Sequence, residues 1–158
     1  MAIIYRDDHF GVDWRQLKSL LAADRFDNGR TADQLRESFT GSRHVCLAWE
    51  YRRVVATSRV LSDGDSDSYL VDLWTWTPLR GRGTASTMIE RLTSRLAGQH
   101  LVLRTKLDLV PFYERRGFRE HPAAVSRVIG SWLVETDAAN ESPLRSINAN
   151  EGGVPTLP

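Results

Sequence analysis

The chain has 158 residues, of which 41% are hydrophobic and 26% charged, and its formal net charge is +1 at pH 7. This length suits one domain with one substantial core, and the balanced charge provides no global field for a nucleic acid or a membrane surface. A single cysteine excludes an internal disulfide and a cysteine-based zinc site, so we expect no metal.

Membrane and export segments are also not expected. No apolar run is long enough to span a bilayer, and the first seven residues lack the basic start and long apolar stretch of a signal peptide. The sequence therefore predicts a soluble cytoplasmic protein.

The first forty residues predict one strand and two helices. Residues 2–5 read as the strand, and apolar side chains at helical spacing follow over residues 13–24. Thr31 opens a second, short helix, because Gln34 stands three positions later and completes the spacing of a capping box.

A pair of strands comes next. Residues 44–51 and 53–61 read as an antiparallel pair that turns near Arg52, and residues 62–68 form a hairpin loop. Cys46 lies in the apolar part of the first strand. We expect a small buried side chain there rather than a nucleophile, because no histidine is placed to activate it.

The strand over residues 69–77 is rich in aromatic and β-branched side chains, and Pro78 ends it. Strict alternation divides its residues between the two faces of the sheet, unless a bulge intervenes. One face would carry Leu70, Asp72, Trp74 and Trp76, and the other Val71, Leu73, Thr75 and Thr77.

A turn rich in arginine and glycine, Arg80-Gly-Arg-Gly-Thr-Ala85, leads into a helix that Gly98 is placed to end with a left-handed cap. The first N–H groups of a helix lack partners and the helix dipole is positive there, so anions bind at this position. Glycine permits close approach, and two arginines add charge suited to phosphate. An ordinary connecting turn with solvated arginines is the alternative.

Two common nucleotide motifs do not match this turn. No Gly-Lys-Ser/Thr closes it, as a P-loop requires. The next strand, residues 101–105, ends without the acidic residue of a dinucleotide-binding fold. A nucleotide-binding switch is therefore disfavoured.

The last predicted elements are a short helix and two strands. The helix carries Phe112 and Tyr113 and stops at Gly117, where Phe118 begins another strand. A final strand is predicted over residues 125–135. From Thr136 to Pro158 the composition shifts to Asn, Ser, Gly and Pro, which predicts a flexible C-terminal tail.

The order and spacing of these motifs resemble the GNAT superfamily of N-acetyltransferases. The cofactor turn of that family, Gln/Arg-x-x-Gly-x-Gly/Ala, is matched by Arg80, Gly83 and Ala85. Its tyrosine, four residues before a Gly-Phe pair, is matched by Tyr113 and Gly117-Phe118.

Within the superfamily, the stretch 59–63 and the compact Phe-Tyr block look most similar to small single-domain enzymes of the serotonin-acetyltransferase-like kind. The resemblance implies a mixed α/β (α+β) GNAT fold over residues 1–135. Its central sheet would be mostly antiparallel, flanked by helices, with the fourth and fifth strands splayed apart.

The resemblance also implies that acetyl-CoA enters the slot between those splayed strands, with coenzyme A as product. Strand backbone would bond the pantetheine amides, and the turn would hold the pyrophosphate. The cofactor-binding residues expected on this basis are Leu73, Trp74, Thr75, Trp76, Arg80, Gly81, Arg82, Gly83, Thr84, Ala85 and Ser86.

Acetylation of an amine requires a base, a donor for the developing oxyanion and an acid for the departing thiolate. The resemblance makes Tyr113 the acid, since a phenol with a pKa of about 10 stays protonated at neutral pH. Packing of the short helix is its alternative role. A backbone N–H near Leu73 or Trp74 would be the oxyanion donor. Arg115 and Arg116 either meet the phosphates of the cofactor or face solvent.

Asp72 is the first candidate for the base, because many relatives hold a strand carboxylate near the amine. A partner for an arginine such as Arg59 is an equal alternative, and Glu50 with a water chain is another.

We therefore expect transfer of acetyl from acetyl-CoA to an amine by direct attack, without a covalent enzyme intermediate. A small molecule is the first choice of acceptor, and a small amine, an aminoglycoside, an amino acid and a protein N-terminus all stay open. A longer acyl-CoA donor and a non-catalytic acyl-CoA-binding module are the alternatives. By resemblance, Phe26, Asp27 and Arg30 could line the acceptor pocket, or they form a surface turn. A homodimer is compatible with these features.

Overall fold

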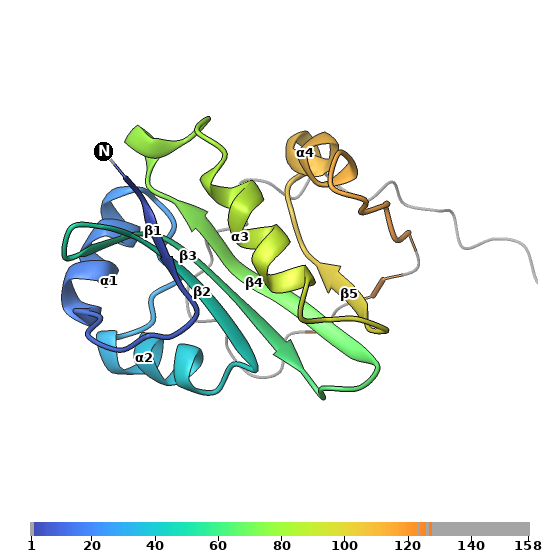
Figure 1. The fold of residues 1–158 in the computed structure, drawn as a ribbon, viewed down its shortest axis with the longest axis horizontal. Helices are drawn as coiled ribbons and strands as arrows, with labels where there is room; N and C mark the ends of the chain where they lie inside the picture. The colour runs from blue at the N-terminus through green and yellow to red at the C-terminus, as the bar shows by residue number, and fades with distance from the viewer. Residues whose placement is uncertain (1, 123, 126, 128–158) are drawn as a thin grey trace, which may run out of the picture.

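The computed structural model describes residues 2–122, 124, 125 and 127. Five strands form one sheet in the order β1-β2-β3-β4-β5, with helices on both faces (Figure 1). The elements are β1 (Ile4–Arg6), α1 (Trp14–Ala23), α2 (Ala32–Thr40), β2 (His44–Glu50), β3 (Arg53–Ser62), β4 (Asp67–Thr75), η1 (Thr77–Leu79), α3 (Thr84–Thr93), β5 (His100–Leu103), η2 (Leu107–Leu109) and α4 (Val110–Glu114).

The strands pair antiparallel from β1 to β4, and β4 pairs parallel with β5. Together with the flanking helices, this confirms the predicted mixed α/β fold with a mostly antiparallel sheet. Among the residues described, no helix is both long and apolar enough to cross a membrane.

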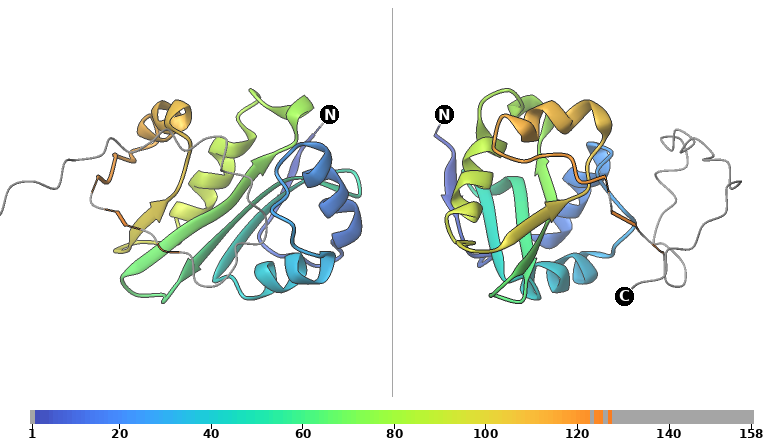
Figure 2. Two further views of the ribbon diagram at one scale, coloured as in Figure 1. Left: turned by 180° about the vertical axis from the view of Figure 1, so that it is seen from behind. Right: turned by 90° about the vertical axis from the view of Figure 1, so that its right-hand side faces the viewer.

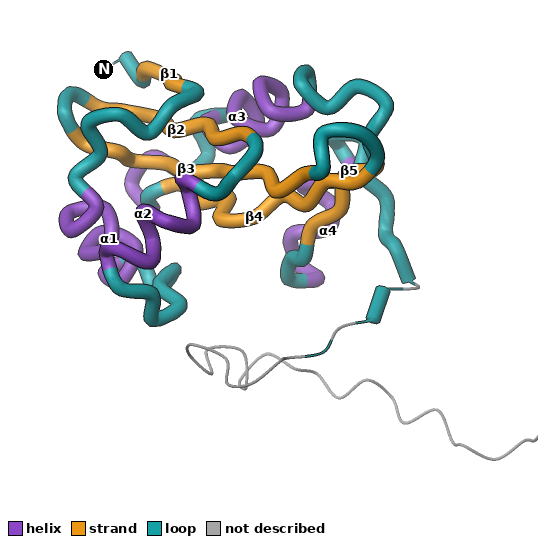
Figure 3. The backbone as a smooth tube through the Cα atoms, turned by 90° about the horizontal axis from the view of Figure 1, so that it is seen from below, coloured by secondary structure: helices purple, strands orange, loops and turns teal. Residues whose placement is uncertain are grey.

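Helices α1 and α2 lie on one face of the sheet, and α3 lies on the other (Figures 2 and 3). Asp13 caps α1 by accepting the Gln16 N–H at 2.9 Å. The predicted capping box opens α2: the Gln34 N–H bonds the Thr31 hydroxyl at 3.1 Å, and the Thr31 N–H bonds the Gln34 side chain at 2.9 Å. These local bonds fix where both helices begin.

The sheet divides the core into two clusters. On one side, Leu17 and Leu21 of α1 pack with Leu35 and Phe39 of α2 and with Trp74. On the other side, α3 packs its apolar residues against the strands; the buried members include Cys46, Val60, Leu70, Met88, Ile89 and Leu92. Apolar side chains at helical spacing thus bury the faces that the sequence predicts.

Cys46 is fully buried in the middle of the sheet. Burial raises the pKa of its thiol to about 11, since the thiolate would lose its solvation there. The expectation of a small buried side chain at Cys46 is confirmed.

Strand β4 leaves β5 halfway along its length. The two strands pair from Asp67 with His100 to Leu70 with Leu103, and β5 ends there while β4 continues to Thr75. In the part of the chain that the structure describes, β4 beyond Leu70 therefore has no neighbour on its β5 side. This is the splay that the family resemblance implies.

A bulge lies at the point where β4 and β5 part. Val71 pairs with Arg59 and Trp74 with Thr57, so Asp72 and Leu73 together face a single residue of β3. Asp72 adopts a left-handed backbone with a φ of 51°. Strict alternation along β4 is consequently wrong, as a bulge requires: Leu70 packs in the cluster of α3 and Trp74 in the cluster of α1 and α2.

The side chain of Asp72 is held by two arginines. Arg30 bonds both carboxylate oxygens, at 2.9 and 3.0 Å, and Arg59 donates Nε to one of them at 2.6 Å. The three side chains are 16%, 10% and 12% exposed, respectively. Burial alone would raise the pKa of Asp72, but the hydrogen bonds and charges of Arg30 and Arg59 outweigh it and lower that pKa.

The end of the chain differs from expectation in several places. Helix α3 ends at Thr93, and Gly98 takes its left-handed conformation in a later turn, with a φ of 81°. Helix α4 ends at Glu114, three residues before the predicted stop at Gly117, and residues 118–122 form no strand, so the strand predicted to begin at Phe118 is wrong there. The strand predicted over 125–135 falls almost wholly outside the described residues, and the tail over 136–158 falls entirely outside them.

We predict that Asp72→Asn lowers the free energy of unfolding by about 3 kcal/mol, because two buried guanidinium groups lose their counter-ion. Asparagine tolerates a left-handed backbone, so the substitution removes the charge and leaves the bulge allowed. Urea titration at pH 7 measures the change. Asp33→Asn is the control, since Asp33 is 87% exposed and its ion pair spans 3.9 Å. It should have little effect.

The difference in the free energy of unfolding between the wild type and Asp72→Asn should also depend on pH. The folded pKa of Asp72 lies below its ordinary value of 3.8. Its contribution is therefore complete above about pH 4 and is lost as the pH falls through the folded pKa. A stability difference that stays constant from pH 6 down to acid unfolding would contradict the ion-pair assignment.

Candidate active site

The connection from β4 to α3 forms one wall of the candidate site. Gly81 and Gly83 have φ values of 75° and 81°, which non-glycine residues rarely adopt. Gly83 caps α3 without any side-chain hydrogen bond, and a Cβ at either glycine would meet nothing within 4 Å. The space beside both glycines would let a phosphate-sized anion approach the backbone at the start of α3.

Asp24 fixes the start of this connection. One of its carboxylate oxygens accepts hydrogen bonds from Trp74 Nε1 at 2.8 Å, from the Thr77 N–H at 3.2 Å and from Arg80 at 2.8 Å. Burial would raise the pKa of Asp24, but the bonds from Thr77 and Trp74 and the charge of Arg80 lower it below the ordinary value. The residue that ends α1 thus ties that helix to the end of β4.

The two arginines of the turn are used differently. Arg80 donates Nε to the Thr75 carbonyl at 2.9 Å as well as bonding Asp24, so its guanidinium is committed to holding the turn. Arg82 is exposed, and within the described residues it forms no hydrogen bond or ion pair. Its charge is available to a ligand.

Tyr113 lies in α4, half-buried between two aromatic rings. The rings of Phe112 and Phe118 meet it edge-on, with centroids 5.1 and 5.6 Å away. Burial raises the pKa of Tyr113 despite the opposing effects of Thr105, just beyond β5, and of Arg116. The phenol is thus protonated at neutral pH and lies near the end of β5. Both of its predicted roles, acid and packing, stay predictions.

Arg116 is more closely involved than its sequence position indicates. Its guanidinium donates from Nε to the Ser86 hydroxyl at 3.1 Å and also bonds the Phe112 carbonyl. Its Cζ lies 3.6 Å from the centroid of the Phe112 ring. A solvent-facing role is therefore wrong for Arg116, which brings a positive charge to the first turn of α3. Arg115 is exposed.

The structure bears on each candidate for the base. Asp72 pairs with Arg59, as its alternative role predicts, and also with Arg30. A carboxylate with a lowered pKa and two cationic partners accepts protons poorly at neutral pH. Glu50 pairs with Arg53 at 3.2 Å.

The loop between α1 and α2 is also largely committed to internal contacts. Arg30 is only 8% exposed and points at Asp72, and Lys18 holds Asp27 at 2.8 Å. Phe26, at 39% exposed, is the most accessible of the three residues predicted to line the acceptor pocket.

The remaining predicted cofactor residues lie at the end of β4 and in the first turn of α3. Leu73 and Trp76 are partly buried against the cluster of α3, whereas Trp74 is 2% exposed on the opposite face. The hydroxyl of Thr75 is buried without a hydrogen-bond partner among the described residues. Their backbone belongs to the stretch of β4 that has parted from β5. Thr84, Ala85 and Ser86 form the first turn of α3.

Sequence reasoning missed Asp24 and undervalued Arg116, two residues whose side chains hold the turn and the first turn of α3. Asp24 bonds residues 50 to 56 positions away, and Arg116 bonds a residue 30 positions away. No local pattern could signal either contact, because both depend on how the helices dock.

Solved structures share this fold. A GNAT-family acetyltransferase from Streptococcus pneumoniae is 21% identical, with a TM-score of 0.68 over 82% of this chain and 98% of that one. Glucosamine-6-phosphate N-acetyltransferase from Arabidopsis thaliana is 17% identical, with a TM-score of 0.67 over 82% and 100%. A predicted acetyltransferase from Clostridium acetobutylicum, solved with acetyl-CoA, is 19% identical, with a TM-score of 0.62 over 80% and 96%.

Among proteins with curated functions, none matches this sequence. The family model described as the acetyltransferase (GNAT) domain matches residues 15–135, which include β4, the glycine turn, α3 and Tyr113 and make up most of the chain. The chain therefore belongs to the GNAT acetyltransferase family.

Proposed function

We propose that this protein transfers an acetyl group from acetyl-CoA to the amine of a small molecule in the cytoplasm. The observation that carries the proposal is the parting of β4 from β5 beside the glycine turn that opens α3. Acetyl-CoA would supply an acetyl group activated as a thioester. The names of two similar structures, an amino-sugar N-acetyltransferase and a protein solved with acetyl-CoA, support this choice.

The turn and the first residues of α3 would hold the diphosphate. The N–H groups of Thr84, Ala85 and Ser86 stand at the positive end of the helix dipole. Arg82 adds an exposed charge, and Arg116 adds one already positioned by Ser86. Backbone groups of residues 73–76 would bond the pantetheine amides, as an added strand bonds a free sheet edge.

Tyr113 would hold the proton that the departing sulfur takes up. Its raised pKa keeps the phenol protonated throughout the neutral range, which a general acid requires. Asp72 is not part of this proposal, because two arginines already neutralise it. We assign removal of the proton from the amine to water instead.

One observation favours a second candidate, a domain that binds acyl-CoA without catalysis. Tyr113 packs edge-on between Phe112 and Phe118, and such contacts stabilise the fold without any chemistry. A tyrosine with only this role could be replaced by phenylalanine at no cost to a reaction.

We predict that Tyr113→Phe lowers kcat by about 100-fold or more, the scale of a lost general acid, while acetyl-CoA affinity changes little. Release of free coenzyme A with a panel of small amines measures the rate, and calorimetry measures binding. Tyr69→Phe is the control, because it removes the same hydroxyl from β4 outside the proposed site. Undiminished turnover in Tyr113→Phe would exclude the acid role. Binding without turnover on any amine would favour the non-catalytic domain.

We predict that Arg82→Ala raises the Kd for coenzyme A about tenfold and leaves the melting temperature unchanged, since the lost charge meets only the ligand. Arg80→Ala should lower the melting temperature as well, because Asp24 and the Thr75 carbonyl lose their donor. Calorimetric titration and thermal unfolding of both variants distinguish the two effects. An unchanged Kd in Arg82→Ala would remove that residue from the phosphate site.

A further inference from the structure

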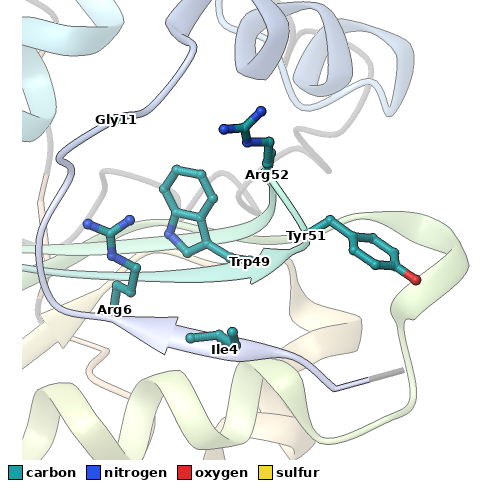
Figure 4. Close-up of a pocket in the computed structure, with 6 residues that line it drawn as sticks. All are labelled: Ile4, Arg6, Gly11, Trp49, Tyr51 and Arg52. Atoms are coloured by element: carbon teal, nitrogen blue, oxygen red, sulfur yellow. The ribbon is translucent and has the colours of Figure 1, made fainter.

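A hollow of about 300 Å³ lies at the β1 edge of the sheet, apart from the proposed active site (Figure 4). The lining includes no residue of β4, of the turn that opens α3 or of α4. The residues that line it come from β1, the loop after it and the end of β2: Ile4, Arg6, Gly11, Trp49, Tyr51 and Arg52.

The centre of the hollow is the indole of Trp49. Trp49 pairs with Ile4 across the two strands and is only 6% exposed. Its Nε1 is buried and has no hydrogen-bond partner within the described residues. An unpaired buried donor is unfavourable, so a ligand atom that accepts this hydrogen bond would be stabilised beyond its own contacts.

Two arginines lie on either side of this indole (Figure 4). The Cζ of Arg6 is 5.1 Å from the ring centroid, and its guanidinium bonds Asp8 at 2.7 Å. This ion pair is exposed, and such pairs are weak, so a ligand carboxylate can compete with Asp8 for the guanidinium of Arg6. Arg52 is exposed and makes no ion pair with any described residue.

The remaining walls are apolar or open. Ile4 is 60% exposed, and Gly11 leaves free space where a side chain would stand. The charged and buried polar groups that line the hollow are all donors, and two of them are guanidinium forks that match a planar carboxylate. The hollow therefore favours an anion with a flat apolar body that rests on the indole.

We propose that this hollow is a binding site for a small aromatic carboxylate. The carboxylate accepts hydrogen bonds from Arg6, Arg52 and Trp49 Nε1, and the apolar ring of the ligand lies in the hollow against the exposed side chain of Ile4. The site is independent of the acyl transfer proposed above, because it shares no residue with the turn, with β4 or with Tyr113.

Titration with benzoate, followed through the indole N–H signals in two-dimensional NMR, tests the site. Trp49→Phe identifies the Trp49 signal. We expect that signal to shift and saturate with benzoate, and to stay in place with uncharged benzamide. Arg52→Gln and Arg6→Gln should each weaken binding about tenfold, the scale of one charge-assisted hydrogen bond. Arg36→Gln, which removes an exposed charge from α2, should not weaken it.

Three results would overturn the proposal. The first is a Trp49 signal that benzoate leaves unchanged in the folded protein. The second is an equal response to benzamide, which would show that the charge is not needed, or to inorganic phosphate, which would show that the apolar ring is not needed. The third is loss of benzoate binding when coenzyme A is added, because the probe would then occupy the acyl-CoA slot instead. Persistence of benzoate binding in Arg82→Ala separates this test from that of the proposed function.

Discussion

The ion pairs of Asp72 with Arg30 and Arg59 hold the bulge at which β4 turns away from β5. A left-handed backbone at a non-glycine residue is unfavourable, so a structure keeps it only where surrounding contacts fix it. Here the contacts come from β3 and from the loop before α2, and the Thr57 hydroxyl also bonds the Asp72 carbonyl at 2.8 Å. Pairing with β5 stops two residues before the bulge. The opening between the strands therefore depends on a buried carboxylate held by two arginines.

A second carboxylate has the corresponding role at the far end of β4. Asp24 joins the end of α1 to Trp74, Thr77 and Arg80, so the chain leaves β4 in a fixed direction before it enters the glycine turn. Both aspartates connect the layer of α1 and α2 to the same strand. That layer, which carries no predicted phosphate contact, nevertheless determines where the backbone of residues 73–76 and the turn lie.

Local patterns predicted the parts of the fold that local bonds determine. Thr31 and Gln34 form their capping box between residues three apart, so a short pattern was enough to place the start of α2. Asp72 left two roles open, since a strand carboxylate looks the same whether it faces a ligand or an arginine. Its partner Arg30 stands 42 residues away, where no periodicity reaches. The bulge likewise depends on the register with β3, so alternation alone could not place Leu70 and Trp74 on different faces.

The division of positive charge around α3 has a consequence for how an anion would be bound. Arg116 is already ordered by Ser86 and the Phe112 ring, so it loses little side-chain entropy when a ligand arrives. Arg82 is exposed and must be immobilised, which offsets part of its attraction. Arg80 bonds Asp24 and the Thr75 carbonyl, and it acts on a ligand mainly through its field. If the turn binds an anion as proposed, the backbone N–H groups and the ordered guanidinium of Arg116 would supply most of the binding, and the exposed charge of Arg82 would adjust to the ligand.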